Sequence, residues 1–317
     1  MSMDGKPNVA VLTVTFDNDL KWLDKSWRSY SAFCKNYSSY NVIIDDHEKD
    51  CEQSCGFLKA NDINYHTDTE AKYITTGYVR QQYMKFFCDK YVPVDTDWIC
   101  HVDSDSIFLE EHTPDVYFSE SGKPIMLIES YDHINKTHIG ENNDHWRRII
   151  TDALKLEEPV EYEFMRRMPL IYPKWLFEEV RQWFIDNHGM TIFEYLNDLD
   201  TFSEYNFLGA YCWKYHHDLY EWVDIGNDSS EWKDIPFMQE YSHQDSLEKE
   251  KLIQYLLGSP SIYTWMKDVI AAAEKNECNL DGIEHKHYSF NRNKALRNLY
   301  RMLLIVAHPH VEQDWLK

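Results

Sequence analysis

The sequence predicts an α/β fold with a mainly parallel sheet flanked by helices. In the first half of the chain, short β-rich runs alternate with segments whose apolar residues recur at helical spacing. Strands that alternate with helices form βαβ units, which give parallel pairing and right-handed crossovers. The chain has 317 residues, 43% of them apolar, which is enough for one large core.

The first half of the chain contains four predicted strands and three predicted helices. A strand over 9–16 precedes a helix over 20–36, where Leu20, Leu23, Trp27, Tyr30 and Phe33 recur at helical spacing. A second strand over 41–44, a short helix through Phe57 and Leu58, a third strand over 63–66, a helix over about 76–90 and a fourth strand over 98–102 follow. This order favours a nucleotide-binding type of α/β sheet.

The second half becomes mostly helical. A fifth strand over 124–131 is expected to bring its polar tail near Asp103 and Asp105. Helices are predicted over 146–154, 175–187 and 203–217, with Pro173 in the first turn of the second one and Gly189 at its end. A late strand over 220–225, a loop over 226–230 and largely helical structure from about 244 complete the chain. We expect one domain over 1–245 and a helical C-terminal extension over 246–317 that packs on it.

Composition narrows the classes of partner. The formal net charge of −22 repels a phosphate backbone, which disfavours general nucleic-acid binding unless a basic patch is present. The seven cysteines are scattered and fit neither a redox pair nor a zinc set, so reduced thiols are the simplest interpretation. No apolar segment of the kind found in a signal peptide follows the first residues. No apolar run approaches the length of about 18 residues that a membrane span needs. These features predict a cytoplasmic protein.

Asp103 and Asp105 are the strongest chemical signal in the chain. They follow the apolar run 98–102, so we expect them at the carboxyl edge of the sheet, where open α/β sheets bind ligands. Two crowded carboxylates repel each other, and a bound cation relieves that repulsion. A hard ion such as Mg²⁺ or Mn²⁺ prefers oxygen ligands and typically also binds a substrate phosphate. The alternative interpretation is a solvated Asp-Ser-Asp-Ser turn.

Other polar residues follow the neighbouring predicted strands. Thr15 ends the first strand, and Asp46 follows the second, where its carboxylate suits ribose hydroxyls or a base edge. A helix cap or turn is an equally good interpretation of Asp46. Arg80, one turn into the helix that begins near Gly77, has a guanidinium that matches the oxygens of a diphosphate. Its alternative role is a surface ion pair with an acidic neighbour.

The order of these motifs resembles the GT-A type of nucleotide-sugar glycosyltransferases, in particular the DUF6492-like group. The resemblance covers roughly residues 8–245. It is carried by the Thr-Val-Thr-Phe strand, Gly77 with 80–82 and Lys85, Asp103-Ser104-Asp105 as a DxD motif, 165–167 with Pro169, 202–206 with Gly209, and 241–243.

The resemblance implies a metal-dependent transfer of a hexosyl or pentosyl group from a nucleotide-sugar donor, such as a UDP-sugar, to an acceptor hydroxyl. Asp103 and Asp105 would hold Mn²⁺ or Mg²⁺ on the diphosphate, and His243 would complete the metal shell. Donor binding would use Arg80 and Gln81 together with Thr15 and Asp46. Arg166 and Arg167 could meet sugar or phosphate groups, but adjacent strand residues face opposite ways, so at most one enters the site. The acceptor, which could be a glycan, a metabolite or a modified nucleobase, is not specified by the sequence.

Glu204 has two readings. Ser203 is a suitable N-cap, and a Glu in the first turn of a helix is favoured by the helix dipole. The resemblance instead implies that Glu204 projects into the cleft, where it acts as a general base or holds hydroxyls of the donor or acceptor. An inverting reaction needs such a base, whereas a retaining one does without it.

Two other functions are compatible with the sequence. A haloacid-dehalogenase-like phosphatase also carries a strand followed by Asp-x-Asp, with the first Asp as nucleophile. Its motif usually lies near the N-terminus and has Thr or Val where this chain has Ile107. The other alternative is a non-catalytic nucleotide-sugar binding protein, against which the intact Asp103, Asp105 and His243 argue.

Overall fold

The structure is a computed structural model that describes residues 7–16, 19–45, 52–68, 71–74, 76–108, 113–137, 144–165, 169–226 and 237–239. The chain divides into two compact units. The first comprises the described residues of 1–20, 36–104 and 113–228, and the second those of 21–35, 105–112 and 229–317. The predicted boundary at residue 245 and the helical extension beyond it lie outside the described residues and stay predictions.

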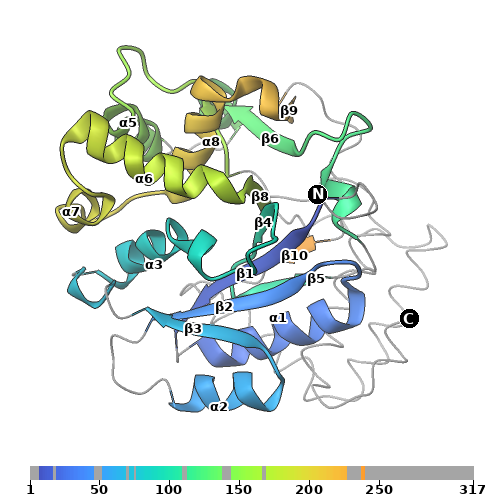
Figure 1. The fold of residues 1–317 in the computed structure, drawn as a ribbon. Coiled ribbons are helices and arrows are strands. Elements are labelled where there is room, and N and C mark those ends of the chain that lie inside the picture. The colour runs from blue at the N-terminus through green and yellow to red at the C-terminus, as the bar shows by residue number, and fades with distance from the viewer. Residues whose placement is uncertain are drawn as a thin grey trace, which may run out of the picture. The chain divides into compact units, whose positions relative to one another are not determined.

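A five-stranded sheet forms the centre of the first unit (Figure 1). Its order is β3 (Asn64–Asp68), β2 (Ser39–Asp45), β1 (Val9–Thr15), β4 (Trp98–His101) and β8 (Leu170–Pro173). The first four strands are parallel, and β8 runs antiparallel to β4. All seven residues of β1 are buried, as expected for a central strand covered on both faces. The predicted fold class, an α/β fold with a mainly parallel sheet flanked by helices, is confirmed.

The predicted fifth strand exists but belongs to a different sheet. β6 (Ile125–Ser130) pairs with β7 (Tyr162–Glu163) and β9 (Glu221–Asp224) in a three-stranded sheet. The place beside β4 is taken by β8, which was not predicted as a strand. Its four-residue run Leu-Ile-Tyr-Pro is too short for a clear periodicity and ends in a proline that suggests a helix start.

The described helices comprise the six that were predicted, with corrections at their ends, and two that were not predicted, the fourth and the seventh. They are α1 (Leu20–Phe33), α2 (Glu52–Ala60), α3 (Gly77–Lys85), α4 (Tyr131–Thr137), α5 (Asp144–Ala153), α6 (Lys174–His188), α7 (Ile192–Asn197) and α8 (Glu204–Tyr215). α3 is shorter than predicted, and a separate short 3-10 helix covers Cys88–Lys90. Gly189 ends α6 with a φ of 68°, whereas Pro173 is its N-cap and not part of its first turn. In the part of the chain that is described, no helix combines the length and apolarity needed to cross a membrane.

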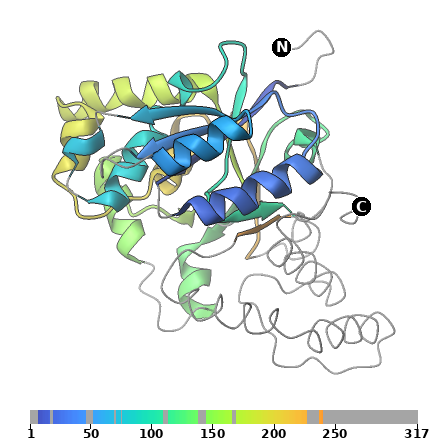
Figure 2. The ribbon, with the colours of Figure 1, turned by 90° about the horizontal axis from the view of Figure 1, so that it is seen from below.

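The helices that matter for the site gather around α3. α3 packs against β1 and β2 of the main sheet and against the helices α7 and α8. Figures 1 and 2 show α3, α6 and α7 close together. Aromatic rings fill the space between them, with Phe207 5.9 Å from Phe86 and 5.0 Å from Phe184 between ring centroids. This packing fixes the first turn of α8 next to α3.

The second unit has its own small sheet. β5 (Ser106–Phe108) pairs antiparallel with β10 (Phe237–Gln239). In the same unit, the Phe108 amide donates to Ser29 Oγ of α1 at 3.0 Å, and its ring meets Tyr30 edge-on.

Gly209 allows α8 to approach the segment after β7. A Cβ on Gly209 would lie 2.3 Å from Phe164 Cβ, which belongs to a rigid part of its side chain. We expect Gly209→Ala to lower the free energy of unfolding by about 1–3 kcal/mol, because overpacking outweighs the better helix propensity of alanine. Urea denaturation of the purified chain measures the change.

Gly56→Ala in α2 is the matched control, because nothing lies within 4 Å of its Cβ position. We expect this variant to gain up to about 1 kcal/mol. Equal effects at both positions would contradict the role given to Gly209.

Candidate functional site

Asp103 lies at the point where the strand order of the main sheet reverses. From β1 the chain builds β2 and β3 on one side, and it then returns to place β4 on the other side of β1. The Val102 amide still donates to Leu12 O at 3.0 Å, so Asp103 comes directly after the last contact between β4 and β1. Ligands of open α/β sheets bind outside the carboxyl ends of the strands at such a switch point. The Asp103 side chain is 21% exposed there.

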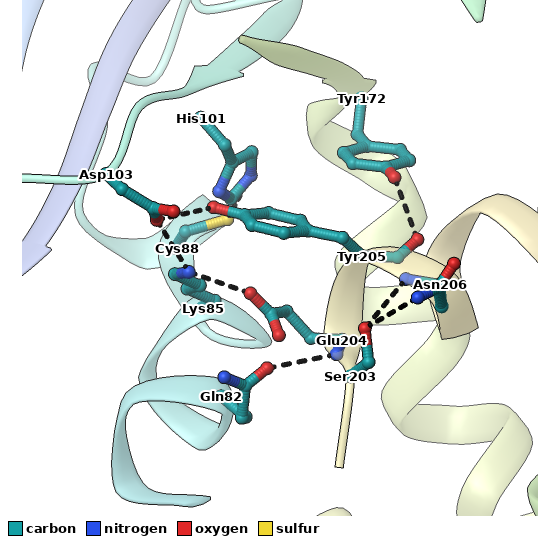
Figure 3. Close-up of polar contacts among 10 residues, drawn as sticks. All are labelled: Gln82, Lys85, Cys88, His101, Asp103, Tyr172, Ser203, Glu204, Tyr205 and Asn206. Carbon is teal, nitrogen blue, oxygen red and sulfur yellow. Dashed lines mark hydrogen bonds and ion pairs between the residues drawn. The ribbon is translucent and has the colours of Figure 1, made fainter. Parts of the chain in front are cut away.

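A buried ammonium group pairs with Asp103. Lys85 Nζ at the end of α3 lies 2.9 Å from Asp103 Oδ1 and 2.8 Å from Glu204 Oε1 (Figure 3). The side chains of Lys85 and Glu204 are only 4% and 2% exposed. Buried ions of this kind need close countercharges, because removing them from water costs several kcal/mol each. Lys85 therefore joins the edge of the sheet to the start of α8.

Two further side chains hold this cluster in place. The ring of Tyr205 lies under the ammonium, with Lys85 Nζ 4.2 Å from its centroid, and the Tyr205 hydroxyl donates to Asp103 Oδ1 at 3.4 Å. Gln82 Oε1 accepts the backbone N–H of Glu204 at 3.1 Å. Gln82 and Lys85 come from neighbouring turns of α3, so one helix face positions both ends of the cluster (Figure 3).

The electrostatics of Lys85 and Glu204 follow from their burial. Burial works to lower the pKa of Lys85, but Asp103 and then Glu204 outweigh it and raise that pKa well above its usual value. Burial raises the pKa of Glu204 above its usual value, against the opposing effect of Lys85. Lys85 is therefore a permanent cation at neutral pH, whereas Glu204 takes up a proton more readily than an exposed carboxyl.

The local sequence explains why α8 begins at this place. Ser203 is the N-cap, and its Oγ accepts the backbone amide of Asn206 at 3.4 Å and the Asn206 side-chain amide at 3.1 Å. Asn206 Oδ1 accepts the Phe164 amide at 2.8 Å. The predicted N-cap at Ser203 is confirmed, and Glu204 is the first residue of the helix. The role of Glu204 as a general base stays a prediction.

His101 lies in the layer next to this cluster. Its ring contacts that of Phe177. It also contacts the rings of Tyr172 and Tyr205, and its Nε2 is 3.6 Å from the Cys88 sulfur (Figure 3). Burial, assisted by the charge of Lys85, lowers the pKa of His101 to about 3. The imidazole is therefore neutral at physiological pH, and it separates the charged cluster from the aromatic core.

The described donor-binding residues differ in their surroundings. Thr15 ends β1 and is buried. Arg80 is also buried: its Nε pairs with Asp45 Oδ2 at 2.8 Å and a terminal nitrogen donates to Ile74 O at 3.1 Å. Gln81 is half-buried on α3. The ion pair foreseen as an alternative for Arg80 is thus present, but inside the protein, and its contact with a diphosphate stays a prediction.

Of the other predicted residues, Asp46, Arg166, Arg167 and His243 lie outside the described residues. Asp105 is buried and belongs to the second unit, whereas Asp103 belongs to the first. Among the residues that the structure describes, no three His, Cys, Asp or Glu side chains form a metal-binding group. The chemistry of the oxygen donors Asp103 and Asp105 suits Mn²⁺ or Mg²⁺, but the complete ligand set stays a prediction.

The sequence did not single out Lys85, Gln82 or Tyr205 as residues of one cluster. Gln82 and Lys85 do lie three residues apart at the end of one predicted helix, and Tyr205 follows Glu204. The sequence does contain one signal for this cluster: Lys85 lies among apolar residues of a predicted helix, and the carboxylate of Asp103 follows a predicted strand. Their mutual contact depends on how α3 and α8 pack.

No family model matches the chain, and no curated protein matches it. Among solved structures, the galactosyltransferase LgtC in complex with donor and acceptor sugar analogs is 10% identical, with 68% of this chain and 73% of that chain covered and a TM-score of 0.44. The glycosyltransferase GlyE of Streptococcus pneumoniae TIGR4 is 11% identical, with 98% of this chain and 62% of that chain covered and a TM-score of 0.39. A 4-diphosphocytidyl-2C-methyl-D-erythritol synthase from Anaerococcus prevotii DSM 20548 is 9% identical, with 76% of this chain and 95% of that chain covered and a TM-score of 0.40. Similarities this distant assign neither a family nor an activity to the chain.

Removing the ammonium should destabilise the protein in a pH-dependent way. Lys85→Met leaves Asp103 and Glu204 without their shared countercharge, and we expect a loss of about 3–5 kcal/mol at pH 7.5. The loss should shrink as the pH falls to 5, because Glu204, whose pKa is raised by burial, takes up a proton more readily once the cation is removed, and its neutral form needs no countercharge. Urea denaturation at both pH values checks this, and the double variant Lys85→Met/Glu204→Gln should recover part of the loss.

Arg28→Met is the control, because Arg28 forms a surface ion pair with Asp24 at 2.9 Å and its side chain is 41% exposed. Its cost should stay below about 1 kcal/mol. A Lys85 variant no less stable than this control would overturn the description of the buried cluster.

Proposed function

We propose that the chain is a metal-dependent glycosyltransferase that moves a hexosyl or pentosyl group from a UDP-sugar to an acceptor hydroxyl. The observation that carries the proposal is the position of Asp103. It is a partly exposed carboxylate at the switch point of a parallel sheet, and buried side chains hold it from behind. The motif order from Gly77 to His243 in the sequence is the second support.

The arrangement of Asp103 suits a metal-binding role. Lys85 and Tyr205 both contact Oδ1, so the orientation of the carboxylate is fixed before any ligand arrives. Binding groups held in place in this way lose little entropy when they bind. In the proposed site, Asp103, Asp105 and His243 would hold Mn²⁺ or Mg²⁺. When bound, the ion neutralises charge on the departing nucleoside diphosphate.

The remaining predicted residues would bind the donor. Thr15 ends β1, which lies next to β4 in the sheet, and Asp46 follows β2, the strand on the other side of β1, in the sequence; strand ends of this kind suit contacts with the nucleoside. Arg80, Gln81 and one of Arg166 and Arg167 would meet the diphosphate or sugar. Because Arg80 Nε is paired with Asp45 and one terminal nitrogen donates to Ile74 O, we propose that Arg80 binds the donor through its second terminal nitrogen.

The cysteines support a reducing compartment. In the described part of the chain, Cys88, Cys100 and Cys212 are buried and form no disulfide. Free thiols persist in the cytosol, where disulfides are reduced. We propose that the enzyme works in the cytoplasm on an acceptor that is a glycan, a metabolite or a modified nucleobase.

The test combines donor binding with turnover. The full chain is heated with Mn²⁺ and each member of a panel of sugar nucleotides, and release of nucleoside diphosphate is recorded without added acceptor. We expect one UDP-sugar to raise the melting temperature and to be hydrolysed slowly. Asp105→Asn should lower the hydrolysis rate about 100-fold or more, because a lost metal ligand removes several kcal/mol of transition-state stabilisation.

Asp186→Asn on α6 is the matched control. Among the described residues, the exposed Asp186 carboxylate forms one side-chain hydrogen bond, in which it accepts from Gln182 Nε2 at 2.9 Å. The variant should retain the wild-type rate. Full turnover in Asp105→Asn would refute metal dependence, and protection from heating without hydrolysis would indicate a nucleotide-sugar binding protein instead.

A further inference from the structure

Lys85 contacts the same carboxylate that the proposed function assigns to a metal ion. Its Nζ lies 2.9 Å from Asp103 Oδ1, and the Tyr205 hydroxyl donates to that oxygen at 3.4 Å. A metal ion held by Asp103 would therefore bind a carboxylate that already has a positive partner. Two cations on one carboxylate repel each other, and this repulsion is strong where water is largely excluded. The Lys85 ammonium thus opposes the binding of a metal ion on its own.

The ammonium is confined to this position behind Asp103. The side chain of Lys85 is 4% exposed, whereas that of Asp103 is 21% exposed. Nζ lies between the carboxylates of Asp103 and Glu204 (Figure 3), with Glu204 Oε1 at 2.8 Å and the centroid of the Tyr205 ring at 4.2 Å. A ligand that arrives from solvent therefore meets Asp103, and it senses the ammonium through that carboxylate without touching it.

The positive charge of Lys85 acts in opposite directions on a cation and on an anion. The affinity of an oxygen-ligand site for a divalent ion depends on the charge of its ligands, and the ammonium cancels part of the charge of Asp103. It therefore lowers the affinity for Mn²⁺ or Mg²⁺. The same ammonium attracts a diphosphate group across the short distance behind Asp103 and raises the affinity for it.

Glu204 sets how strongly the ammonium acts on Asp103. The Glu204 side chain is 2% exposed, and Gln82 Oε1 accepts its backbone amide at 3.1 Å, so its carboxylate stays on Lys85. Without the charge of Glu204, more of the positive charge of Lys85 would act on Asp103. Without the ammonium, none would. Neutralising Glu204 and neutralising Lys85 should therefore change the affinity for a metal ion in opposite directions, which damage to the fold would not do.

We propose that Lys85 makes metal binding depend on the sugar-nucleotide donor: it weakens binding of the divalent ion alone and strengthens binding of the nucleoside diphosphate. The inference rests on the proposed function, which assigns the ion to Asp103. The diphosphate oxygens supply negative charge to the ion, and this attraction offsets the repulsion by Lys85. Because linked binding is reciprocal, each ligand raises the affinity for the other by the same factor. The ion and the donor thus bind together, and without the donor Asp103 keeps Lys85 as its cation.

The experiment measures the binding of Mn²⁺ and of UDP separately on the full chain. Mn²⁺ is titrated without nucleotide and followed by electron paramagnetic resonance, and UDP is titrated with EDTA present and followed by calorimetry. We expect Lys85→Met to raise the affinity for Mn²⁺ and to lower the affinity for UDP, each about 10-fold, because one buried positive charge is lost. Glu204→Gln should lower the affinity for Mn²⁺ and raise that for UDP. In the wild type, UDP should raise the affinity for Mn²⁺ about 10-fold or more.

Lys174→Met is the matched control, because it removes one positive charge at the opposite end of β4 from Asp103. The Lys174 amide donates to Asp97 O at 2.9 Å, directly before β4. Its ammonium donates to the backbone carbonyls of Pro93 and Val94 at 2.8 and 3.2 Å. This variant changes the net charge of the chain as Lys85→Met does, and it should bind both Mn²⁺ and UDP as the wild type does.

Only opposite changes in Lys85→Met and Glu204→Gln support the inference, and any other combination overturns it while leaving the proposed function intact. If Lys85→Met does not fold, Glu204→Gln decides alone, since its ammonium keeps Asp103 as a partner: weaker Mn²⁺ binding with stronger UDP binding supports the inference, and any other result overturns it. A wild type that binds Mn²⁺ equally well with and without UDP would also overturn it. A wild type that binds neither ligand, separately or together, would instead overturn the proposed function, and the inference with it.

Discussion

The Lys85 ammonium lies between two carboxylates that the chain brings from different elements. Asp103 comes from the end of a strand, and Glu204 from the start of a helix about a hundred residues later. The Glu204 carboxylate, which is 2% exposed, would not be stable there without the cation, and the buried cation would not be stable without its two carboxylates. The contact therefore fixes the distance between the edge of the main sheet and α8, and the neighbouring side chains take their places around it.

The first turn of α8 carries much of the organisation of the first unit. Ser203 caps it, Glu204 pairs with Lys85, Tyr205 covers the ammonium, and Asn206 holds Phe164 and Glu163. The main sheet and the smaller sheet of β6, β7 and β9 thus both depend on one helix start. A change in this turn would move the Asp103 cluster and the strand beside Glu129 together.

The distribution of charge also limits how an acidic chain could bind a phosphate group. The formal net charge is −22. Three of the described cationic side chains are already paired with carboxylates inside the protein. Lys85 pairs with Asp103 and Glu204, Arg80 with Asp45, and Arg181 with Asp89. A bound phosphate would therefore have to share these cations with their carboxylate partners. This is one physical reason why a metal ion suits the proposed site. The ion would add positive charge at a place where the positive charges of the described side chains are already paired with carboxylates.

The sequence by itself determined the elements. Alternating strand and helix patterns predicted β1 to β4 and their parallel pairing, and local rules predicted the cap at Ser203 and the end of α6 at Gly189, because such signals act within one turn or one strand. It also determined that Asp103 follows a buried strand. Only the tertiary structure decided that β8 and not β6 lies beside β4, that Lys85 pairs with both Asp103 and Glu204, and that Glu129 holds His133. These contacts join segments far apart in the chain or across a turn, and burial gives them their strength. No pattern of neighbouring residues encodes which charged side chains will meet once water is excluded.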